Sequence, residues 1–434
     1  MIRSPSRRFS IRVPRFEIPF SVETLGNGIT VVVAPQPGVP VVTVDVTYDV
    51  GSRIEEPGRT GLAHLFEHLM FEGSENAPKG EHFRLVTEAG GVLNGTTSED
   101  RTNYFESLPS EALEVGLFLE ADRMRALVLT QERLAVQREA VKEEKRLRID
   151  NQPYAPSFEA ADTLAFDSFA YRHPVIGSME DLDAASLADV RAFWDAWYAP
   201  SNALLCITGD VTAREAFAAA RRHFGAVPRR PSPPPFRHEE PDQASGRRAR
   251  VTDPHAALPA LHISFRLPRR RHPDLLALAY AEKVLSGGES GRLWRRLVKD
   301  GDAALSFSAS LDERRGASLF RLFAVVRPGA SLAGVEREIE DDLARLAGDG
   351  PSEREMERAR RMLAADGLRA TQTTSSIAFL LSEYGLYDHD PGLWREDWDG
   401  LLGTTRNEVR EAAARAFVPE RRSVVEVEPE GDAA

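Results

Sequence analysis

Hydrophobic residues recur at the spacing of an α-helix between about Gly61 and about Glu72. Roughly 100° of rotation per residue gathers the apolar side chains on one arc and three polar side chains on the opposite arc. The apolar set is Leu62, Leu65, Phe66, Leu69 and Met70, and the polar set is His64, Glu67 and His68. The pattern predicts a helix that packs through one face and carries two imidazoles and a carboxylate on the other.

The flanking residues carry signals that start and stop helices. Pro57-Gly58 predicts a turn before the segment, and Thr60 is a candidate N-cap because its hydroxyl can accept a hydrogen bond from a free backbone N–H. Gly73 follows the last apolar residues and is a candidate C-terminal stop. We expect the helix to begin near Gly61 and to end near Glu72.

Three other segments show clear patterns. The residues from Thr130 to Asp150 predict a second, highly charged helix. The residues from Gly91 to Thr97 alternate like a strand, and the apolar run from Ala203 to Ile207 predicts a buried strand. Cys206, the one cysteine of the chain, lies in that run, so we expect a buried thiol, no disulfide and no oxidising compartment.

A break in composition divides the chain. The proline-rich residues 229–250 predict a semi-extended linker. On either side an internal repeat is visible, because Val190 leads through Tyr198 to a strand and Val409 leads through Phe417 to another strand at the same spacing. With 434 residues, of which 42% are hydrophobic, the chain is long enough for two cores.

Charge and hydropathy exclude some classes of protein. The net charge of -12 argues against nucleic acid as the main partner. No run approaches 18 consecutive apolar residues, so we expect no membrane span. The basic N-terminus from Met1 to Arg8 is followed by no apolar segment of signal-peptide length, so we read no export signal and expect a cytoplasmic location.

The polar face of the first helix has the residues of a metal site. His64 and His68 are one turn apart, so neutral imidazole nitrogens can reach a single Zn²⁺ at about 2.0 to 2.1 Å. Glu67 would lie beside the metal as the general base for peptide hydrolysis. The order H-x-x-E-H is the inverzincin signature. The competing interpretation is an amphipathic surface helix that happens to carry two histidines.

A third protein ligand must come from elsewhere, and a carboxylate is the usual choice beside two histidines. The charged helix offers three candidates, Glu139, Glu143 and Glu144. Spacing alone does not choose among them, and each could be an ordinary solvated glutamate. The other eight histidines lie at no metal-ligand spacing, and we expect them at the surface or at helix caps.

Three stretches taken in order resemble the pitrilysin and insulysin family of zinc metallopeptidases, and most closely its shorter, processing-peptidase-like branch. They are His64 to His68, Asn94 to Thr97, and Gln137 to Glu144. The resemblance implies a fold of two homologous α+β domains, each a β-sheet backed by helices, facing each other across a cleft. It also implies that Glu144 is the third zinc ligand. Gln137 stands where the family often carries a further glutamate.

This resemblance assigns residues 1–228 to an N-terminal catalytic zinc domain, 229–250 to the linker, and 251–434 to a degenerate C-terminal domain. The second domain repeats the pattern of the zinc helix between Leu278 and Leu285 but has none of the ligands. We therefore expect it to form the opposite wall of a cleft that holds substrate.

The resemblance also implies a substrate edge. The family uses the strand equivalent to Gly91 to Thr97 as an edge onto which an extended peptide is added, and main-chain pairing of this kind has little sequence preference. Asn94 would hold the peptide backbone near the scissile bond. Its alternative role is that of a turn asparagine before Gly95.

Single-chain members of the family carry an arginine and a tyrosine after a Gly-rich loop, and this pair helps to stabilise the oxyanion. The same spacing here leads to Val298 and Leu305, unless a shift of register brings in Arg292 or Arg296. Some members divide the labour, and a homologous companion subunit supplies the pair. We therefore expect this chain to be the zinc-bearing subunit of a heterodimer.

The sequence thus predicts a zinc-dependent endopeptidase or oligopeptidase for extended peptides, with one Zn²⁺ bound by His64, His68 and Glu144 and with Glu67 as general base. The alternative is a noncatalytic scaffold or assembly subunit that keeps the fold. Scaffold relatives usually lose a ligand or the base, whereas all four residues are present here.

Overall fold

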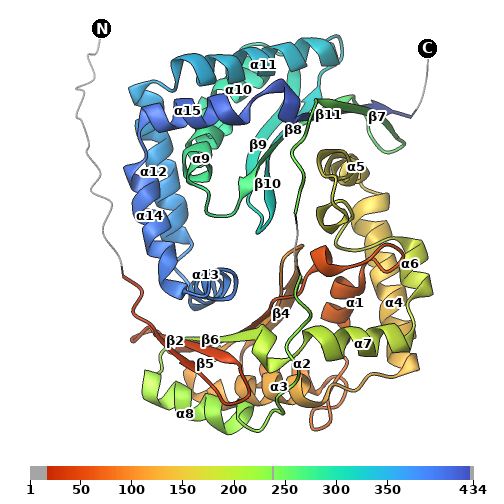
Figure 1. Ribbon diagram of the computed structural model, residues 1–434, viewed down its shortest axis with the longest axis vertical. Helices are drawn as coiled ribbons and strands as arrows, with labels where there is room; N and C mark the ends of the chain where they lie inside the picture. The colour runs from red at the N-terminus through yellow and green to blue at the C-terminus, as the bar shows by residue number, and fades with distance from the viewer. Residues whose placement is uncertain (1–16, 237–238, 431–434) are drawn as a thin grey trace.

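Residues 17–236 and 239–430, the part of the chain that the computed structural model describes, form two β-sheets that are each covered by helices (Figure 1). The N-terminal residues in which we read no export signal lie outside these ranges. Within the described ranges, no helix combines the length and the apolar character needed to cross a membrane.

The first sheet has the strand order β1-β2-β6-β3-β5-β4, so β4 lies at its edge. β2 and β6 are parallel, and the other neighbours are antiparallel. The strands are β1 (Ser21–Thr24), β2 (Thr30–Pro35), β3 (Val41–Tyr48), β4 (Val92–Thr97), β5 (Thr102–Pro109) and β6 (Ala203–Gly209).

The second sheet repeats this arrangement in the order β7-β11-β8-β10-β9. Its one parallel pair is β7 and β11, which corresponds to β2 and β6, and β9 takes the edge position of β4. The predicted fold class, two homologous α+β domains, is confirmed. The strands are β7 (Arg247–Asp253), β8 (Ala260–Arg269), β9 (Ala304–Asp312), β10 (Ala317–Val326) and β11 (Arg422–Pro429).

Helices connect the strands in both halves. The helices of the first half are α1 (Leu62–Leu69), α2 (Glu81–Glu88), α3 (Leu113–Ala126), α4 (Gln131–Lys145), α5 (Ala155–Ala165), α6 (Met179–Ala184), α7 (Leu187–Trp197) and α8 (Ala213–Phe224). Those of the second half are α9 (Pro273–Ser286), α10 (Arg292–Trp294), α11 (Leu332–Asp349), α12 (Glu353–Arg369), α13 (Thr374–Tyr387), α14 (Trp394–Gly403) and α15 (Arg406–Ala416).

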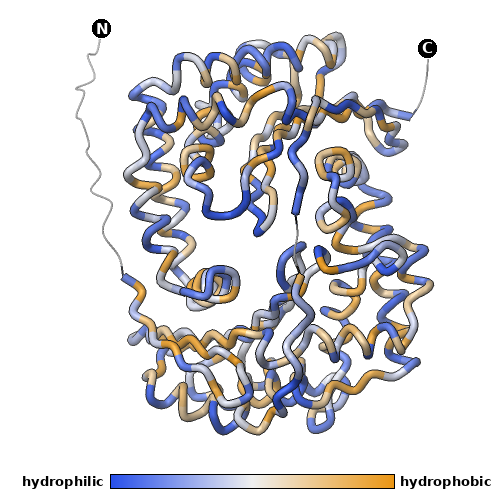
Figure 2. The backbone as a smooth tube through the Cα atoms, viewed as in Figure 1, coloured by the Kyte–Doolittle hydropathy of each residue, from blue (hydrophilic) through white to orange (hydrophobic). Residues whose placement is uncertain are grey.

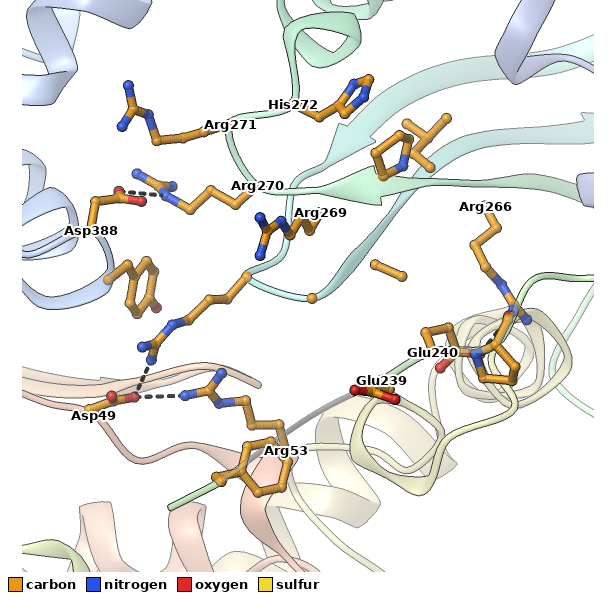
Figure 3. Close-up of a pocket in the computed structure, with 18 of the residues that line it drawn as sticks. Asp49, Arg53, Glu239, Glu240, Arg266, Arg269, Arg270, Arg271, His272 and Asp388 are labelled. Carbon is orange, nitrogen blue, oxygen red and sulfur yellow. Dashed lines mark hydrogen bonds and ion pairs between the residues drawn. The ribbon is translucent and has the colours of Figure 1, made fainter. Parts of the chain in front are cut away.

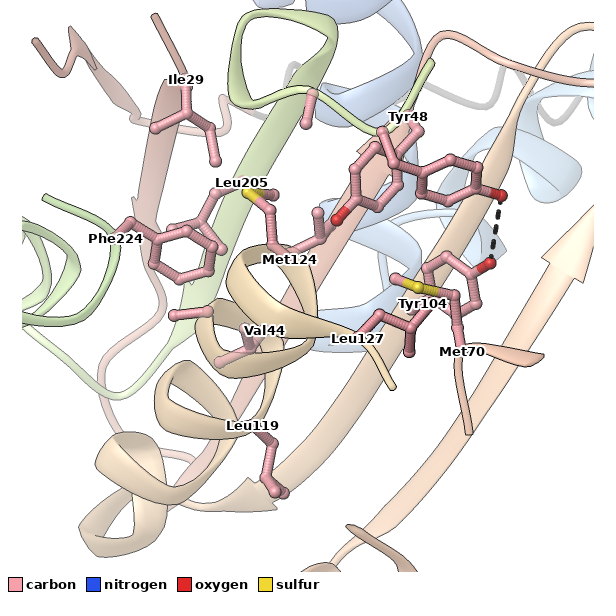
Figure 4. Close-up of a cluster of buried hydrophobic side chains, with 14 of the residues drawn as sticks. Ile29, Val44, Tyr48, Met70, Tyr104, Leu119, Met124, Leu127, Leu205 and Phe224 are labelled. Atoms are coloured by element: carbon pink, nitrogen blue, oxygen red, sulfur yellow. Dashed lines mark hydrogen bonds between the residues drawn. The ribbon is translucent and has the colours of Figure 1, made fainter. Parts of the chain in front are cut away.

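The core of the first half fixes α1 against the sheet. The predicted apolar face of α1 is buried, since none of its five apolar residues exposes more than 7% of its surface. Figure 4 shows part of this core, where Met124 of α3 lies among residues of β3 and β6 and Met70, just after α1, lies near Tyr104 of β5. Burial of this size is the main force that holds so short a helix in place.

One helix of each half packs on the sheet of the other half. α13 of the second half packs on β3 and β6 of the first sheet, and α5 of the first half packs on β7, β8 and β11 of the second (Figure 1). Cys206 and Val32 are buried against Ile377 and Leu381 of α13. This second cover explains why β6 is buried on both faces, and the expected buried thiol of Cys206 is confirmed.

The linker ends earlier than the sequence predicts. β7 begins at Arg247, inside the predicted linker 229–250, because Arg247 to Val251 pair with β11 in a parallel ladder. The division into units at 1–228 and 251–434 remains a prediction, and the exchanged helices tie the two units together. In the tube of Figure 2 the loop that joins β8 to α9 is strongly hydrophilic, in keeping with its three successive arginines, Arg269 to Arg271.

One buried carboxylate joins α13 to the first sheet. Asp45 of β3 accepts hydrogen bonds from the hydroxyl of Ser382 at 2.6 Å, the amide of Asn103 at 2.7 Å and the hydroxyl of Thr47 at 2.9 Å. Burial raises the pKa of Asp45, and these three donors oppose that rise. The contact between the halves therefore depends on a complete set of donors.

Replacement of Ser382 by alanine should lower the free energy of unfolding by about 1 to 3 kcal/mol, because a fully buried acceptor loses a donor. Urea denaturation followed by circular dichroism would measure the change. Ser375→Ala, at a half-exposed position of the same helix, is the control. Equal stabilities for the two variants would contradict the role given to the Asp45 contact.

Candidate metal centre

The helix that carries the two histidines is shorter than predicted and is capped differently. α1 spans Leu62–Leu69, and its N-cap is Gly61 with φ of 84°, not Thr60. The carboxylate of Glu55 accepts hydrogen bonds from the N–H groups of Gly61 at 2.9 Å and Ala63 at 2.8 Å. A carboxylate that satisfies orphan N–H groups at a helix N-terminus also matches the helix dipole, so a cap from outside the helix replaces the predicted local one.

A second carboxylate holds the residue just before that helix. Asp181 of α6 accepts hydrogen bonds from the N–H of Thr60 at 2.9 Å and from its hydroxyl at 2.5 Å. Gly61 also needs to be glycine, since a Cβ there would lie 2.7 Å from the carbonyl oxygen of Ile176. The entry to α1 is thus fixed by residues far along the chain.

His173 completes the Glu55 cap. Its Nε2 lies 3.1 Å from a Glu55 carboxylate oxygen, and its Nδ1 lies 2.8 Å from the carbonyl oxygen of Phe169. Because both partners are acceptors, both ring nitrogens carry protons. Burial alone would lower the pKa of His173, but these hydrogen bonds raise it above its ordinary value. Burial also raises the pKa of Glu55, and its hydrogen bonds to His173, Ala63 and Gly61 oppose that rise and favour the charged pair.

Three side chains converge on one point between α1 and α4. Nε2 of His64 lies 3.6 Å and Nε2 of His68 lies 3.2 Å from Oε2 of Glu144. All three donor atoms lie within 4.8 Å of one another. Ligand atoms at about 2.0 to 2.1 Å around a tetrahedral Zn²⁺ are about 3.3 Å apart. The donor set and its spacing therefore fit Zn²⁺.

The helix geometry separates Glu144 from the other two candidate carboxylates. Glu139 is 63% exposed and pairs with Lys142, and Glu143 is 58% exposed and pairs with Arg146. Glu144 is 18% exposed and faces the imidazoles. A π-helical turn follows directly at residues 146–150, a feature that is frequent at functional sites.

The protonation of the two imidazoles suits ligation through Nε2. Nδ1 of His68 lies 3.3 Å from Oε1 of Gln137, whose amide in turn donates to Glu72 at 2.7 Å. The carboxylate of Glu72 fixes which end of the amide faces His68, so Nδ1 carries the proton and Nε2 presents a lone pair. Burial and the neighbouring His68 lower the pKa of His64 to about 4, which keeps it neutral.

The sequence pattern did not identify two neighbours of the site, Glu72 and Arg148. Glu72 also accepts from Lys79 at 2.7 Å, so Gln137 belongs to a chain of polar contacts behind His68. Arg148 pairs with Oε1 of Glu144 at 2.7 Å, which leaves Oε2 to the imidazoles. The i to i+4 spacing of Glu144 and Arg148 was a signal for the second contact.

Glu67 lines the same cavity and takes no part in the cluster of donor atoms. Its Oε2 accepts a hydrogen bond of 2.5 Å from the hydroxyl of Thr97, the last residue of β4. Burial raises the pKa of Glu67, and the Thr97 hydrogen bond opposes this rise. A partly buried carboxyl with a raised pKa beside a ligand cluster suits a general base.

The cavity around these residues has a volume of about 910 Å³ and is lined wholly by residues 64–148. The second half therefore contributes no wall to it, in contrast to the expected cleft with one wall from each domain. Asn94 lines this cavity, and its side-chain oxygen accepts from the N–H of Gly95 at 2.9 Å. Its predicted contact with substrate remains a prediction.

A larger cavity of about 1270 Å³ does lie between the two halves (Figure 3), but it holds none of the predicted site residues. Arg270 on its rim pairs with Glu313, Glu383 and Asp388, so part of the basic loop is engaged rather than exposed. This cavity is the cleft between the domains, and the metal centre lies outside it.

The residues at the positions of the expected arginine and tyrosine lie away from the site. Neither Val298 nor Leu305 lines the cavity around His64. The two alternatives are engaged in the second half, since Arg292 pairs with Glu355 and Arg296 with Glu338. A shift of register therefore does not restore the pair.

A second group of possible ligands already has a cation beside it. Donor atoms of His82, Glu106 and Glu120 lie within 4.8 Å of one another and are buried. The guanidinium of Arg123 pairs with Glu120 and lies 3.6 Å from Glu106, so the positive charge there is an arginine. The expectation that histidines outside the helix lie at the surface or at caps is wrong for His82 and His262, which are buried, whereas His173 completes the cap of α1.

The comparisons with known proteins agree with this geometry. Residues 30–172 match the family described as Insulinase (Peptidase family M16), and residues 184–363 match the Peptidase M16 inactive domain. The zinc protease PqqE of Helicobacter pylori is 31% identical over 375 residues, which cover 85% of this chain and 84% of that protein. The mitochondrial-processing peptidase subunit beta of Blastocladiella emersonii is 28% identical over 212 residues, which cover 48% and 44%.

A solved structure extends the likeness to the fold. The crystal structure of a protease from Helicobacter pylori superimposes with a TM-score of 0.92 at 28% identity, over 95% of this chain and 100% of that one. Both halves and their relative placement are therefore shared with that protease.

Gln137→Leu should weaken zinc binding by about 10- to 100-fold, because His68 loses the acceptor that sets its tautomer and ring orientation. Competition with a chromophoric chelator measures the affinity. Gln131→Leu, an exposed glutamine at the start of the same helix, is the matched control. Wild-type affinity in Gln137→Leu would show that the contact has no such role.

The His173 ion pair predicts a pH dependence of stability. The pKa of His173 is raised on folding, so its contribution is full below the unfolded pKa of about 6.5 and is lost as the pH rises through the folded value. The stability difference between wild type and His173→Gln should be larger at pH 6 than at pH 8.5. Urea denaturation of metal-free protein tests this, with the exposed His255→Gln as control. A difference that grows with pH would contradict it.

Proposed function

Because the chain belongs to the insulinase family of M16 peptidases, we propose that it is a zinc-dependent endopeptidase or oligopeptidase that hydrolyses extended peptides. One observation carries the proposal: the donor atoms of His64, His68 and Glu144 converge within 4.8 Å in a cavity that Glu67 also lines. We assign the first three to zinc and Glu67 to the general base.

The roles of the side chains follow from their contacts. Zinc, when bound, supplies a Lewis acid that polarises the scissile carbonyl and lowers the pKa of a bound water toward about 7. Glu67 accepts a proton from the attacking water at Oε1, since Thr97 engages Oε2. The same carboxyl then returns the proton to the leaving amine.

Peptide binding is assigned to β4. This edge strand pairs with β5 on one side, and among the described residues no strand pairs with its other side, which an added strand could therefore take. Asn94 lies in the middle of β4 and lines the cavity, so we assign it to the peptide backbone near the scissile bond. Phe83 and Leu147 on the cavity rim are about half exposed and offer an apolar contact to substrate side chains.

We also propose that a homologous companion subunit completes the site. All the residues that line the cavity belong to one half of this chain, and Val298 and Leu305 replace the expected oxyanion donors. Loss of one such donor typically costs about 10²- to 10³-fold in rate. The chain alone should therefore hydrolyse peptides slowly. The likeness to a protein named as a beta subunit is in keeping with this arrangement.

Glu67→Gln should abolish hydrolysis of a quenched fluorescent peptide library, with a loss of about 10²- to 10⁴-fold, because the amide cannot accept the proton. Zinc content by mass spectrometry should stay at one ion per chain, since Glu67 is not a ligand. Glu143→Gln, an exposed carboxylate on the cavity rim, is the matched control and should stay active.

The outcomes separate the proposed peptidase from a scaffold. Turnover by the purified chain that disappears in Glu67→Gln establishes an autonomous peptidase and removes the need for a companion. Turnover that survives in Glu67→Gln contradicts the role of the base. A wild type that is inactive alone and stays inactive with a homologous companion would contradict the peptidase function and favour the scaffold function.

A further inference from the structure

The general base is held by a residue that itself needs support. The Thr97 hydroxyl donates to Oε2 of Glu67 at 2.5 Å, which fixes the rotation of the carboxylate and leaves Oε1 to take the proton. Thr97 ends β4, which is an edge strand and pairs through β5 alone in the described sheet. The loop that follows, Ser98 to Arg101, must therefore set the position of Thr97.

That loop is closed on itself and pinned to the first half. Ser98 donates its N–H to the carbonyl of Arg101 at 2.9 Å, and its hydroxyl accepts from the N–H groups of Asp100 and Arg101. Arg53 donates its N–H to the carbonyl of Glu99 at 2.9 Å. The backbones approach so closely that a Cβ on Gly51 would lie 2.4 Å from that carbonyl oxygen.

The second half also contacts the loop 98–101. The turn between β9 and β10, residues 313–316, reaches across to it: the N–H of Arg315 donates to Oδ2 of Asp100 at 2.9 Å, and the guanidinium of Arg314 lies 3.0 Å from Glu99. Tyr171 bridges the two, because its hydroxyl donates to Oδ1 of Asp100 at 2.7 Å and accepts from the N–H of Gly316 at 2.8 Å.

These contacts are buried. The side chains of Arg314 and Asp100 expose 4% and 8% of their surfaces, so their pairs are screened far less than surface pairs. The Arg315 guanidinium adds a pair with Asp49 at 2.5 Å. Arg53 also pairs with Asp49, at 2.7 Å (Figure 3). The 313–316 turn is thus held firmly, so its position helps to determine the position of the loop 98–101.

We propose that the 313–316 turn of the second half is a positioning element for the general base: it holds the loop 98–101, the loop sets Thr97, and Thr97 orients Glu67. The inference rests on the proposed function only in treating Glu67 as the base. It gives the half without ligands a direct part in the chemistry of the other half. Thr97 and Tyr171 are positioning residues, since each acts through another group.

A second route from the same half supports the edge strand. Ser382 of α13 donates to Asp45, Asp45 accepts from the amide of Asn103, and the amide oxygen of Asn103 accepts from the hydroxyl of Thr96 at 2.6 Å. β4 is therefore anchored next to Thr97 as well as after it. Both routes begin on the second half and end within three residues of Thr97.

Two substitutions of Thr97 test the link to the base. Thr97→Val keeps the shape but removes the donor, and Thr97→Ser keeps the donor. In whichever preparation turns over peptide, the chain alone or with its companion, Thr97→Val should lower kcat about tenfold or more with KM within about twofold. Thr97→Ser should stay within about threefold of wild type. Equal kcat values for the two variants would overturn the role of Thr97.

Tyr171→Phe tests the link across the halves. It removes the hydroxyl that joins Asp100 to Gly316, and hydrogen exchange of the amides of residues 92–101 should speed up about fivefold or more. Tyr384→Phe removes a comparable hydrogen bond, to Asp397 at 2.8 Å, and should leave that segment unchanged. In an active preparation, Tyr171→Phe should also lower kcat while zinc content stays at one ion per chain.

The exchange measurement needs no catalytic activity, so it separates the two proposals. A wild type without turnover would count against the proposed function, while faster exchange in Tyr171→Phe would still support the coupling. Unchanged exchange in Tyr171→Phe, with a folded protein by circular dichroism, would overturn the positioning role of the turn whether or not the protein hydrolyses peptides.

Discussion

The meeting of α1 with α4 is the constraint on which the rest of the structure depends. For Zn²⁺ to bind as proposed, two imidazole nitrogens on one helix must face a carboxylate oxygen on another with an error of a few tenths of an ångström. A helix as short as Leu62–Leu69 has little stability of its own. Three contacts therefore hold it in place. They are its buried apolar face, the Glu55 carboxylate at its N-terminus and the hydrogen bond between Gln137 and His68.

The same constraint explains why a half without ligands is kept. Each half builds its main core from its own chain, but the opposite face of each sheet is covered by a helix of the other half: α13 covers β3 and β6, and α5 covers β7, β8 and β11. A second half that served only as a wall would not need buried contacts such as Ser382 to Asp45. Its polar contacts run toward the edge strand, which is the part of the first sheet that borders the metal centre.

The sequence predicted the features that local periodicity records and missed those that depend on distant partners. The apolar arc of α1, the strand at Val92–Thr97 and the internal repeat follow from spacing, and the structure has them. The fold of two homologous α+β domains was implied by the family resemblance. The contact of His173 with Glu55 and that of Thr97 with Glu67 join residues far apart in the chain, so no local pattern predicted them. The Glu55 cap is closer in the chain, but it comes from outside the turn in which an N-cap is sought. The family resemblance, not spacing, singled out Glu144.

The cavity around His64 has an open strand edge and an exposed apolar rim. It opens beside an edge strand whose outer main-chain groups have no neighbouring strand in the described sheet, and its rim carries Phe83 and Leu147, each about half exposed. Val92 at the start of β4 is 65% exposed. Exposed apolar side chains beside an open strand edge are unfavourable in water and are typical of a surface that binds a ligand or a partner protein. An added peptide strand would pair with β4, and a companion subunit would close over it. In the proposed complex the companion would contact the bound peptide as well as the rim, so a chain alone would lack those contacts and hydrolyse peptides slowly.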